Sequence, residues 1–303
     1  MLRQVSTSVC AAALLVPALL SQHHQTDAQL AAHARPVHAG PVHSRPVHGS
    51  PVHSRPGHGR PVTAGTATQV LDVNYESGTA DSGIPGLTTT HATAPDASSI
   101  VQPGYRSRYA AQFKVTLGDP GYVSDGAPRS EDATDQLPNG IFHVGDTQRY
   151  DISILLKDWQ PYQAGDSDTG DIIFQGKYGG AQPPAFYLMT KRNAIAFRSP
   201  NLNLQTTVVP DFRPYINQWL NFQVDAHWAT DTTGYFTVSV QLPGQCGYTQ
   251  MVSWQNVATW DPRSTADDGY LKWGLYRPSE SLANGDVPTR IVQDDDIRIF
   301  NLS

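Results

Sequence analysis

Apolar and polar side chains alternate along many segments of this chain, and this two-residue period constrains its fold more than any other feature. Because successive side chains of a strand point to opposite faces, such alternation predicts strands with one buried face. The segment 219–228 shows the pattern without interruption, so we expect it to form a strand on a hydrophobic core. Its two faces would be formed by Leu220, Phe222, Val224, Ala226 and Trp228 and by Asn221, Gln223, Asp225 and His227.

Similar strand patterns recur along the chain, separated by clusters of Gly, Pro, Asn and Asp that are typical of turns. They cover residues 69–75, 109–117, 149–156, 171–178, 185–189, 194–198, 219–228, 234–242, 270–276 and 296–302. No segment shows a convincing amphipathic helix. The sequence therefore predicts an all-β protein, an antiparallel β-sandwich or jelly roll whose first strand pairs near its last. The acidic run of residues 294–296 is interpreted as a turn before the final strand.

The segment 270–276 has one apolar face and one face with two phenols, an ammonium group and a glycine. Leu271, Trp273 and Leu275 form the first face, and Tyr270, Lys272, Gly274 and Tyr276 form the second. An exposed strand with tyrosines of high strand propensity is one explanation of the second face. The glycine, however, would let a ligand approach the backbone closely. The pattern favours a binding groove for an acidic, ring-shaped ligand.

The first 65 residues are expected to lie outside the folded domain. Residues 1–28 resemble a secretory signal, with a basic Arg3 before an apolar run over residues 11–20 that is too short to span a membrane. Residues 29–65 contain Pro-x-His triplets every five residues, and proline at this density favours an extended, solvated linker. We expect a secreted, extracellular protein with a disordered linker and one folded domain over residues 66–303.

The charge distribution excludes some partners. Residues 63–303 contain 16 Lys and Arg against 26 Asp and Glu, a net charge of −10. So acidic a domain lacks the broad basic surface that nucleic-acid binding requires. No apolar run after residue 20 is long enough to span a bilayer. We expect a monomer that binds neither nucleic acid nor membrane.

Several functional side chains occur two residues apart and would share one strand face. Arg129 and Glu131 form one such pair, and Gln175 and Lys177 form another, with Gly176 clearing space between them. A structural ion pair is an equally simple explanation of Arg129 and Glu131, and the lysines could be solvated surface charges. Basic and amide groups on one face would otherwise suit the recognition of carboxylates.

These motifs resemble those of the jelly-roll polysaccharide lyases, a group that includes alginate lyases, heparin lyase I and glucuronan lyases. Residues 129–131 (Arg-Ser-Glu), 175–177 (Gln-Gly-Lys) and 270–277 (YLKWGLYR) occur in the family's order. The last is similar to the family strand Tyr-Phe-Lys-x-Gly-x-Tyr, and residues 219–228 match Trp-x-x-Phe-x-Val-x-x-x-Trp. The resemblance covers about residues 66–303 and is strongest to glucuronan lyases. Several relatives have Gln-x-His where this chain has Lys177.

The resemblance implies a carbon–oxygen lyase that cleaves a uronic-acid polymer, glucuronan-like, by β-elimination. Removal of the proton at C5 places a second negative charge beside the sugar carboxylate, so aimed donors must stabilise it. A base must take this proton and an acid must protonate the leaving oxygen. The resemblance implies Tyr276 as the acid, or for both steps, with Arg129, Gln175 and Lys177 as donors. The expected substrate-binding residues further include Glu131, Lys272, Arg277 and Tyr270.

Histidines are scarce in the expected domain. His143 follows the Arg-Ser-Glu motif and is the candidate base or neutralising group by elimination, although a plain surface histidine is equally compatible with its position. His227 shares the polar face of its strand with Asp225 and is a second, substrate-binding candidate. His91 lies in a loop, and we expect no role for it.

Metal chemistry is not expected. No Cys/His cluster has the spacing of a zinc site, and we expect that catalysis requires no cofactor. Members of the resembled family often bind calcium, so a structural calcium ion near loop acids is a further expectation. The candidate ligands are Asp166, Asp168, Asp294, Asp295 and Asp296.

Two other classes of function remain open from the residues alone. A non-catalytic carbohydrate-binding jelly roll would stack sugars on Trp254, Trp260 and the face of Tyr270 and Tyr276. A glycoside hydrolase would need two paired carboxylates, and the sequence contains no matching pair. The three classes differ in their products, since only elimination creates an unsaturated uronate.

Overall fold

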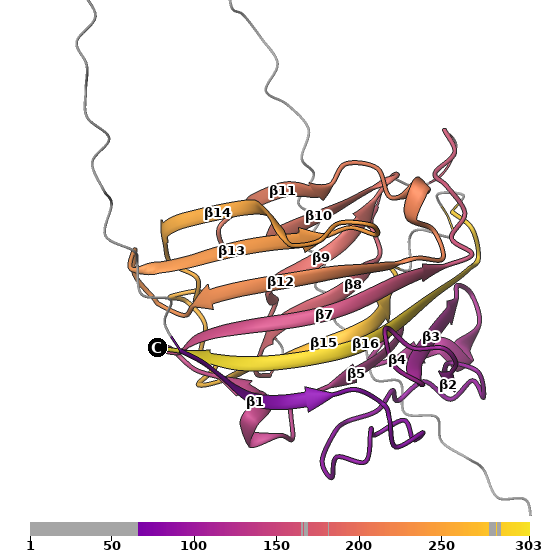
Figure 1. Cartoon of the computed structure of the whole chain (residues 1–303), viewed down its shortest axis with the longest axis horizontal. Helices are drawn as coiled ribbons and strands as arrows, with labels where there is room; N and C mark the ends of the chain where they lie inside the picture. The colour runs from indigo at the N-terminus through magenta and orange to yellow at the C-terminus, as the bar shows by residue number, and fades with distance from the viewer. Residues whose placement is uncertain (1–65, 165, 167–168, 181, 279–282, 284–285) are drawn as a thin grey trace, which may run out of the picture. The chain divides into compact units, whose positions relative to one another are not determined.

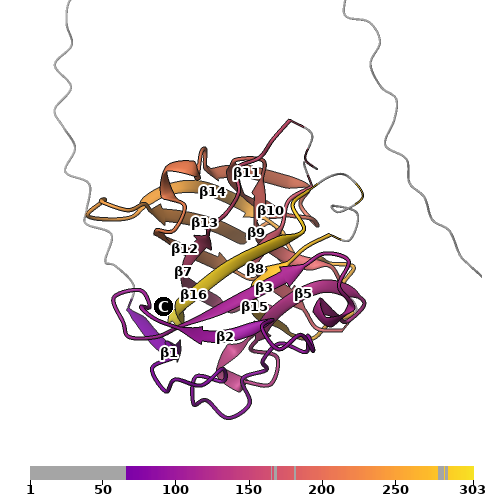
Figure 2. The same ribbon diagram turned by 90° about the vertical axis from the view of Figure 1, so that its right-hand side faces the viewer.

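The computed structural model describes residues 66–303 except 165, 167–168, 181, 279–282 and 284–285. The expected signal segment and linker therefore lie outside the described residues. Within the compact unit Pro61–Ser303, strands form two antiparallel sheets that pack face to face (Figure 1, Figure 2). The described residues contain no helix long and apolar enough to cross a membrane. The predicted all-β sandwich is confirmed.

Sheet A has the strand order β14-β13-β12-β7-β16-β3-β2, and β1 also pairs with the long β16. Its strands are β1 (Ala67–Val73), β2 (Ser98–Val101), β3 (Ala110–Thr116), β7 (Thr147–Lys157), β12 (Trp219–His227), β13 (Gly234–Gln241), β14 (Thr249–Val257) and β16 (Thr289–Leu302). The predicted pairing of the first strand with the last is confirmed, because Ala67 lies opposite Leu302.

Sheet B has the order β11-β10-β9-β8-β15-β5-β4, with β6 pairing along β15 beyond the end of β5. Its strands are β4 (Val123–Ser124), β5 (Ala127–Ala133), β6 (Ile141–Phe142), β8 (Ile172–Tyr178), β9 (Pro184–Lys191), β10 (Ala194–Ser199), β11 (Leu204–Val209) and β15 (Gly269–Tyr276). Three short 3-10 helices complete the described elements: η1 (Pro120–Tyr122), η2 (Pro138–Gly140) and η3 (Arg213–Tyr215).

The core lies between the two sheets and follows from the alternation of the strands. The apolar face of β12 is fully buried, and so are Leu271, Trp273 and Leu275 of β15. Aromatic rings connect the layers: Phe142 stacks on Trp228 with ring centroids 4.0 Å apart. The faces predicted for both strands are therefore confirmed, and the outer face of β15 is left for other contacts.

The acidic run of residues 294–296 is not a turn. It lies inside β16, where the pairing with β7 shifts between Asp295 and Arg298, and Asp296 has a φ of 53°. Asp294 points into the core with no exposed surface, and burial raises its pKa well above the ordinary value. The interpretation failed because an interior bulge carries the same residue types as a turn.

Both glycines that were expected to make room for a ligand face protein instead. A Cβ on Gly274, whose φ is 111°, would lie 2.4 Å from the carbonyl oxygen of Ser130 on the neighbouring β5. A Cβ on Gly176 would lie 2.4 Å from the ring of Phe186. These glycines allow close packing of the sheet and its core, so the interpretation of them as ligand clearance is wrong.

Candidate active site

The register of sheet B aligns a row of outward side chains across six strands. We call this row the central row, and it consists of Ala133 (β5), Lys272 (β15), Gln175 (β8), Tyr187 (β9), Arg198 (β10) and Gln205 (β11). Directly opposite residues of paired strands share one face. The neighbours Trp273, Phe174 and Phe197 are buried in the core, so the central row faces away from it.

A second line of residues crosses the same face at the other end of β15. Tyr276 lies opposite Arg129 on one side and Ile172 on the other. Together with Gln175, Lys177, Pro184, Tyr187 and Pro200, these three residues line a hollow of about 290 Å³, which we call the Tyr276 hollow. This volume is near the lower limit of small-molecule sites. The hollow therefore has room for a sugar ring beside the tyrosine.

Glu131 is the centre of the polar contacts on this face. Its carboxylate is 3% exposed, pairs with Lys272 Nζ at 2.6 Å and accepts a hydrogen bond from Gln175 Nε2 at 2.5 Å. Arg129 Nη1 lies 3.9 Å from the same carboxylate. A buried carboxylate that binds three side chains fixes their positions, so Glu131 orients the donors and is itself occupied.

Arg129 and Tyr276 form the most reactive arrangement in the hollow. The guanidinium carbon of Arg129 lies 4.8 Å from the centroid of the Tyr276 ring. The Nε atom of Arg129 is buried and has no hydrogen-bond partner in the described structure. A free N–H can bind a carboxylate, and a phenol can exchange a proton. This pair can hold an acid group and move a proton beside it.

Lys177 lies in the hollow, but its ammonium group points to backbone oxygens. Its Nζ donates to the carbonyl oxygens of Tyr178, Gly180 and Gln182 at 3.4, 3.1 and 2.5 Å. Burial lowers the pKa of Lys177, and the nearby charges of Lys272 and Arg129 act in the same direction. Because an ammonium group has three donors, Lys177 is bound to the loop after β8 and has none left for a ligand.

A smaller hollow of about 60 Å³ adjoins the first through Arg129, and we call it the His91 hollow. Its lining includes Glu131, Tyr270 and Lys272, so Tyr270 lies on the outer face of β15 that its strand pattern predicted. Burial raises the pKa of Tyr270 to about 12, with Asp135 and Glu131 acting in the same direction. His91 also lines this hollow because the bridge between Thr88 and Ala133 places its loop beside β5.

A sequence model of the polysaccharide lyase family matches residues 63–298, which include every strand of both sheets except the last residues of β16. The chain belongs to this family. No curated protein sequence matches it.

Among solved structures, the polysaccharide lyase is similar to an endo-β-1,4-glucuronan lyase from the fungus Trichoderma reesei. The TM-score is 0.50 at 17% identity, covering 73% of this chain and 92% of that one. An alginate lyase from Aplysia kurodai has a TM-score of 0.47 at 12% identity, covering 79% and 100%. An alginate lyase from Corynebacterium sp. has a TM-score of 0.43 at 12% identity, covering 63% and 77%. The first of these similarities supports the fold.

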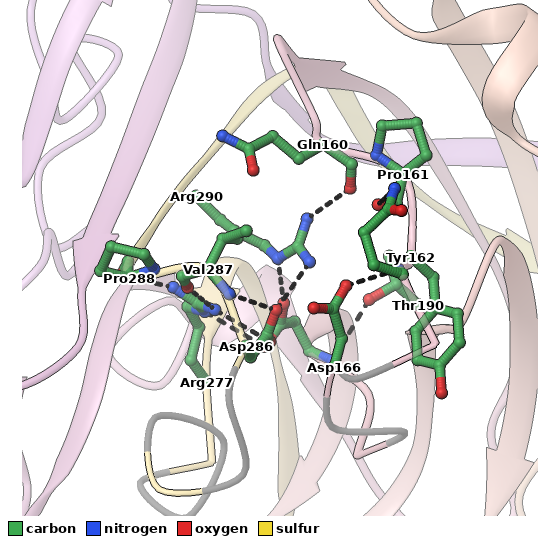
Figure 3. A network of polar contacts seen from close by, with 12 residues as sticks. Gln160, Pro161, Tyr162, Asp166, Thr190, Arg277, Asp286, Val287, Pro288 and Arg290 are labelled. Carbon is green, nitrogen blue, oxygen red and sulfur yellow. Dashed lines mark hydrogen bonds and ion pairs between the residues drawn. The ribbon is translucent and has the colours of Figure 1, made fainter.

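Arg277 of this polysaccharide lyase does not reach the outer face, so its predicted contact with substrate is wrong. Its side chain is fully buried and pairs with Asp171 at 3.2 Å and Asp286 at 3.0 Å. Arg290 binds the same two carboxylates, at 3.2 and 2.9 Å. Figure 3 shows Arg277 and Arg290 pointing together toward Asp286. This four-charge cluster joins the end of β15 to the start of β16, and its donors are occupied inside the protein.

Neither predicted histidine lies near Tyr276. His143 follows Phe142, which pairs with Gly269 at the opposite end of β15. Tyr276 is seven positions after Gly269, about 23 Å along a strand at about 3.3 Å per residue. His227 lies on β12 of the other sheet, where its Nδ1 contacts the Thr147 hydroxyl at 2.8 Å. The polysaccharide lyase therefore cannot use either residue on a sugar at Tyr276, and both site predictions are wrong.

The acids proposed as calcium ligands lie in different surroundings. Asp166 accepts a hydrogen bond from the backbone of Gln163, and Asp168 lies outside the described residues. Asp295 accepts from the Ser107 hydroxyl and the Tyr105 backbone, and burial raises its pKa to about 6. Within the described ranges, no three His, Cys, Asp or Glu side chains form a group that could hold a metal. Bound calcium stays a prediction.

Proposed function

We propose that this polysaccharide lyase cleaves a 1,4-linked uronate polymer, glucuronan-like, by β-elimination. The observation that carries the proposal is the arrangement in the Tyr276 hollow, where a guanidinium with an unpartnered N–H, a primary amide and a phenol surround one space. Recognition of a sugar carboxylate requires the first two groups, and proton transfer requires the third. The likeness to a solved glucuronan lyase supports the choice of polymer.

In the proposed reaction, Arg129 and Gln175 bind the carboxylate of the sugar that will lose its C5 proton. Their N–H groups stabilise the second negative charge that develops as the C5–H bond breaks; one such donor contributes about 3 kcal/mol in comparable sites. The C5 electron pair forms the C4–C5 double bond, the C4–O bond breaks, and the leaving oxygen takes a proton. The products are an unsaturated uronate and a new chain end.

We assign both proton transfers to Tyr276. Its phenolate takes the C5 proton and, as the phenol, gives it to the leaving oxygen, so the residue ends in its starting state. His143, the candidate base, follows the segment that pairs with the far end of β15, and His227 lies on the other sheet. Glu131 and Lys272 hold Gln175 and Arg129 in position.

The alternative, a binding module that stacks sugars on tryptophans, has little structural support. Trp260 is 2% exposed and packs against Phe142 and Tyr178 in the core. Trp254 is partly buried and packs on the rings of Phe197 and Phe236. Side chains that fill the core cannot form a sugar-stacking platform, so only the tyrosine face would remain for this function.

Ultraviolet absorbance during incubation with glucuronan, alginate and heparin tests the proposal. Elimination creates a conjugated unsaturated uronate that absorbs, and we expect absorbance to rise with glucuronan. A hydrolase would release reducing ends without absorbance, and a binding module would produce neither. Reducing ends without absorbance, or no change with any uronan, would reject the proposed reaction. Secretion is a separate proposal, tested by finding the protein in the culture medium with residues 1–28 removed.

A further inference from the structure

Arg198 is a cation without a partner on the outer face of sheet B. It is half-buried, lies between the buried Phe197 and Ser199, and makes no hydrogen bond or ion pair within the described part of the chain. Other arginines are paired: Arg213 binds Asp211, and Arg263 binds Asp261. In a domain with a net charge of −10, an arginine left free beside a sheet face is available for an external anion.

The central row places Arg198 in line with the candidate active site. It lies three strands from Lys272, and neighbouring strands are about 4.8 Å apart, so the separation across the sheet is about 14 Å. Tyr187 lies between Arg198 and Gln175, and it also lines the Tyr276 hollow. A continuous outward row therefore connects the reactive residues to the free guanidinium.

The chemistry of Tyr187 and Arg198 matches the two parts of a uronate. The half-buried phenol ring presents an apolar surface with a polar edge, which suits the face of a pyranose. The guanidinium presents a planar set of donors that fits a carboxylate. One unit of a 1,4-linked chain is roughly as long as the spacing between neighbouring strands. If such a chain lies across the strands with one unit at Lys272, the unit about three sugars further along lies at Arg198.

We propose that Arg198, with Tyr187, forms a distal subsite. This subsite binds the carboxylate of a uronate unit about three sugars from the unit at Lys272. This inference rests on the proposed function for the polymer but not for the proton transfers. Arg198 lies opposite Tyr187, which lines the Tyr276 hollow, so a bound chain must extend across β9 to reach it. The protein should therefore favour longer uronate chains over the shortest ones.

Steady-state kinetics of Arg198→Gln on glucuronan and on its trimer tests the subsite. We expect KM for the polymer to rise by about fivefold, the effect of losing one partly exposed charged hydrogen bond, while kcat changes less than about twofold. The trimer has fewer units to place at Arg198 while it occupies the Tyr276 hollow, so its KM should rise less than that of the polymer. The dependence of the polymer KM on salt should also weaken in the variant.

Arg106→Gln is the matched control, because it removes the same charge from the other side of the protein. Arg106 is exposed and stacks on Tyr105, whose hydroxyl contacts Asn221 of sheet A. This variant should have wild-type KM for polymer and trimer. An unchanged polymer KM in Arg198→Gln, or an equal rise in both arginine variants, would overturn the subsite while leaving the lyase activity intact.

Calorimetric binding of a glucuronan hexamer separates the two proposals if the wild type cleaves nothing. Weaker hexamer binding by Arg198→Gln than by wild type and Arg106→Gln would support the subsite although the proposed reaction had failed. Equal binding by all three proteins, or no binding by the wild type, would overturn the subsite. Matching melting temperatures of the three proteins establish that the variants are folded.

Discussion

Tyr276, the residue assigned to proton transfer, has a charged neighbour but, within the described structure, an unbound hydroxyl. The Arg129 guanidinium lies over its ring, and Gln175 lines the same hollow, but the Tyr276 hydroxyl itself has no hydrogen-bond partner among the described residues. A phenol that is bound to no protein group is free to exchange a proton with a substrate. Glu131 fixes the surrounding donors and leaves the tyrosine oxygen open to the hollow.

Tyr276→Phe should lower kcat on glucuronan by about 100-fold or more, with little change in KM. The substitution keeps the ring and its contact with Arg129 and removes only the oxygen that moves the proton. Steady-state absorbance assays measure both constants. Tyr270→Phe is the control on the same strand face, and it should lower kcat much less than Tyr276→Phe does. Retention of more than about half the wild-type kcat by Tyr276→Phe would contradict the mechanism.

Strand β15 is held from its inner side as well as from its neighbours. Trp273 donates to the Tyr75 hydroxyl at 2.7 Å, and Tyr75 donates to Asp132 on β5 at 2.9 Å. Directly after Tyr276, Arg277 enters the buried cluster that it forms with Arg290, Asp171 and Asp286. Figure 3 shows Arg277, Arg290 and Asp286 of this cluster. Both networks lie under the outer face, so they fix the strand that carries Lys272 and Tyr276.

Arg277→Met should destabilise the protein by about 3–5 kcal/mol, the usual effect of breaking a buried ion pair by removing one partner. The change leaves Asp171 and Asp286 with one arginine between them. Urea denaturation measures the loss. Arg213→Met is the control: it removes an exposed pair with Asp211, which should contribute far less because water screens the charges. Equal stabilities of the two variants would show that the buried cluster contributes little.

Asp132→Asn should change how stability depends on pH. Burial raises the pKa of Asp132 to about 8, while an unfolded aspartate has a pKa of about 3.9. Between these values the unfolded state releases a proton that the folded state keeps, so the wild-type free energy of unfolding falls as pH rises. Asparagine cannot ionise and still accepts the Tyr75 hydrogen bond. The difference in melting temperature, variant minus wild type, should therefore increase from pH 5 to pH 8.

Asp211→Asn is the control for this pH series. Asp211 is on the surface, and its hydrogen bonds with Arg213 lower its pKa from the ordinary value. In both states it is ionised above pH 5, so the difference from wild type should stay constant over the same range. A constant difference for Asp132→Asn as well would mean that Asp132 is ionised in the folded protein.

At the scale of the whole molecule, both sheets are completed within residues 67–302. The two ends of this region meet, since β1 pairs with β16 and Thr66 contacts the Ser303 hydroxyl at 2.8 Å. The net charge of −10 would repel a polyanion in general. The basic residues that face the outer side of sheet B therefore act locally, against the field of the rest of the domain.

A chain that begins at Thr63 should fold as the full-length protein does. Its melting temperature should lie within about 2 °C of the full-length value, because a change of about 1 kcal/mol moves a domain of this size by about 2–4 °C. Differential scanning calorimetry of the two proteins measures this. Removal of residues 63–73, which deletes β1 as well, is the contrasting variant and should lower the melting temperature clearly. A fall of more than about 5 °C for the chain that begins at Thr63 would contradict the expectation.

Alternation along the sequence determined the strand faces, and the motif resemblance indicated the candidate reactive residues. It placed Leu271, Trp273 and Leu275 in the core, and the motif residues Arg129, Gln175 and Tyr276 do share one face. The resemblance was misleading for Arg277, which lies one residue beyond β15 and is buried in ion pairs. Such patterns are local, because each side chain's direction depends on its neighbours two residues away.

Only the tertiary structure decided which strands are neighbours, and with it the extent of the site. Tyr187 and Arg198 join Gln175 and Lys272 because β10, β9, β8 and β15 pair in one register, and His91 joins because its loop lies along β5. His143 is near Arg129 in sequence, yet the pairing of β6 with β15 places it far from Tyr276. Strand pairing depends on packing between segments distant in sequence, and alternation within one segment carries no information about it.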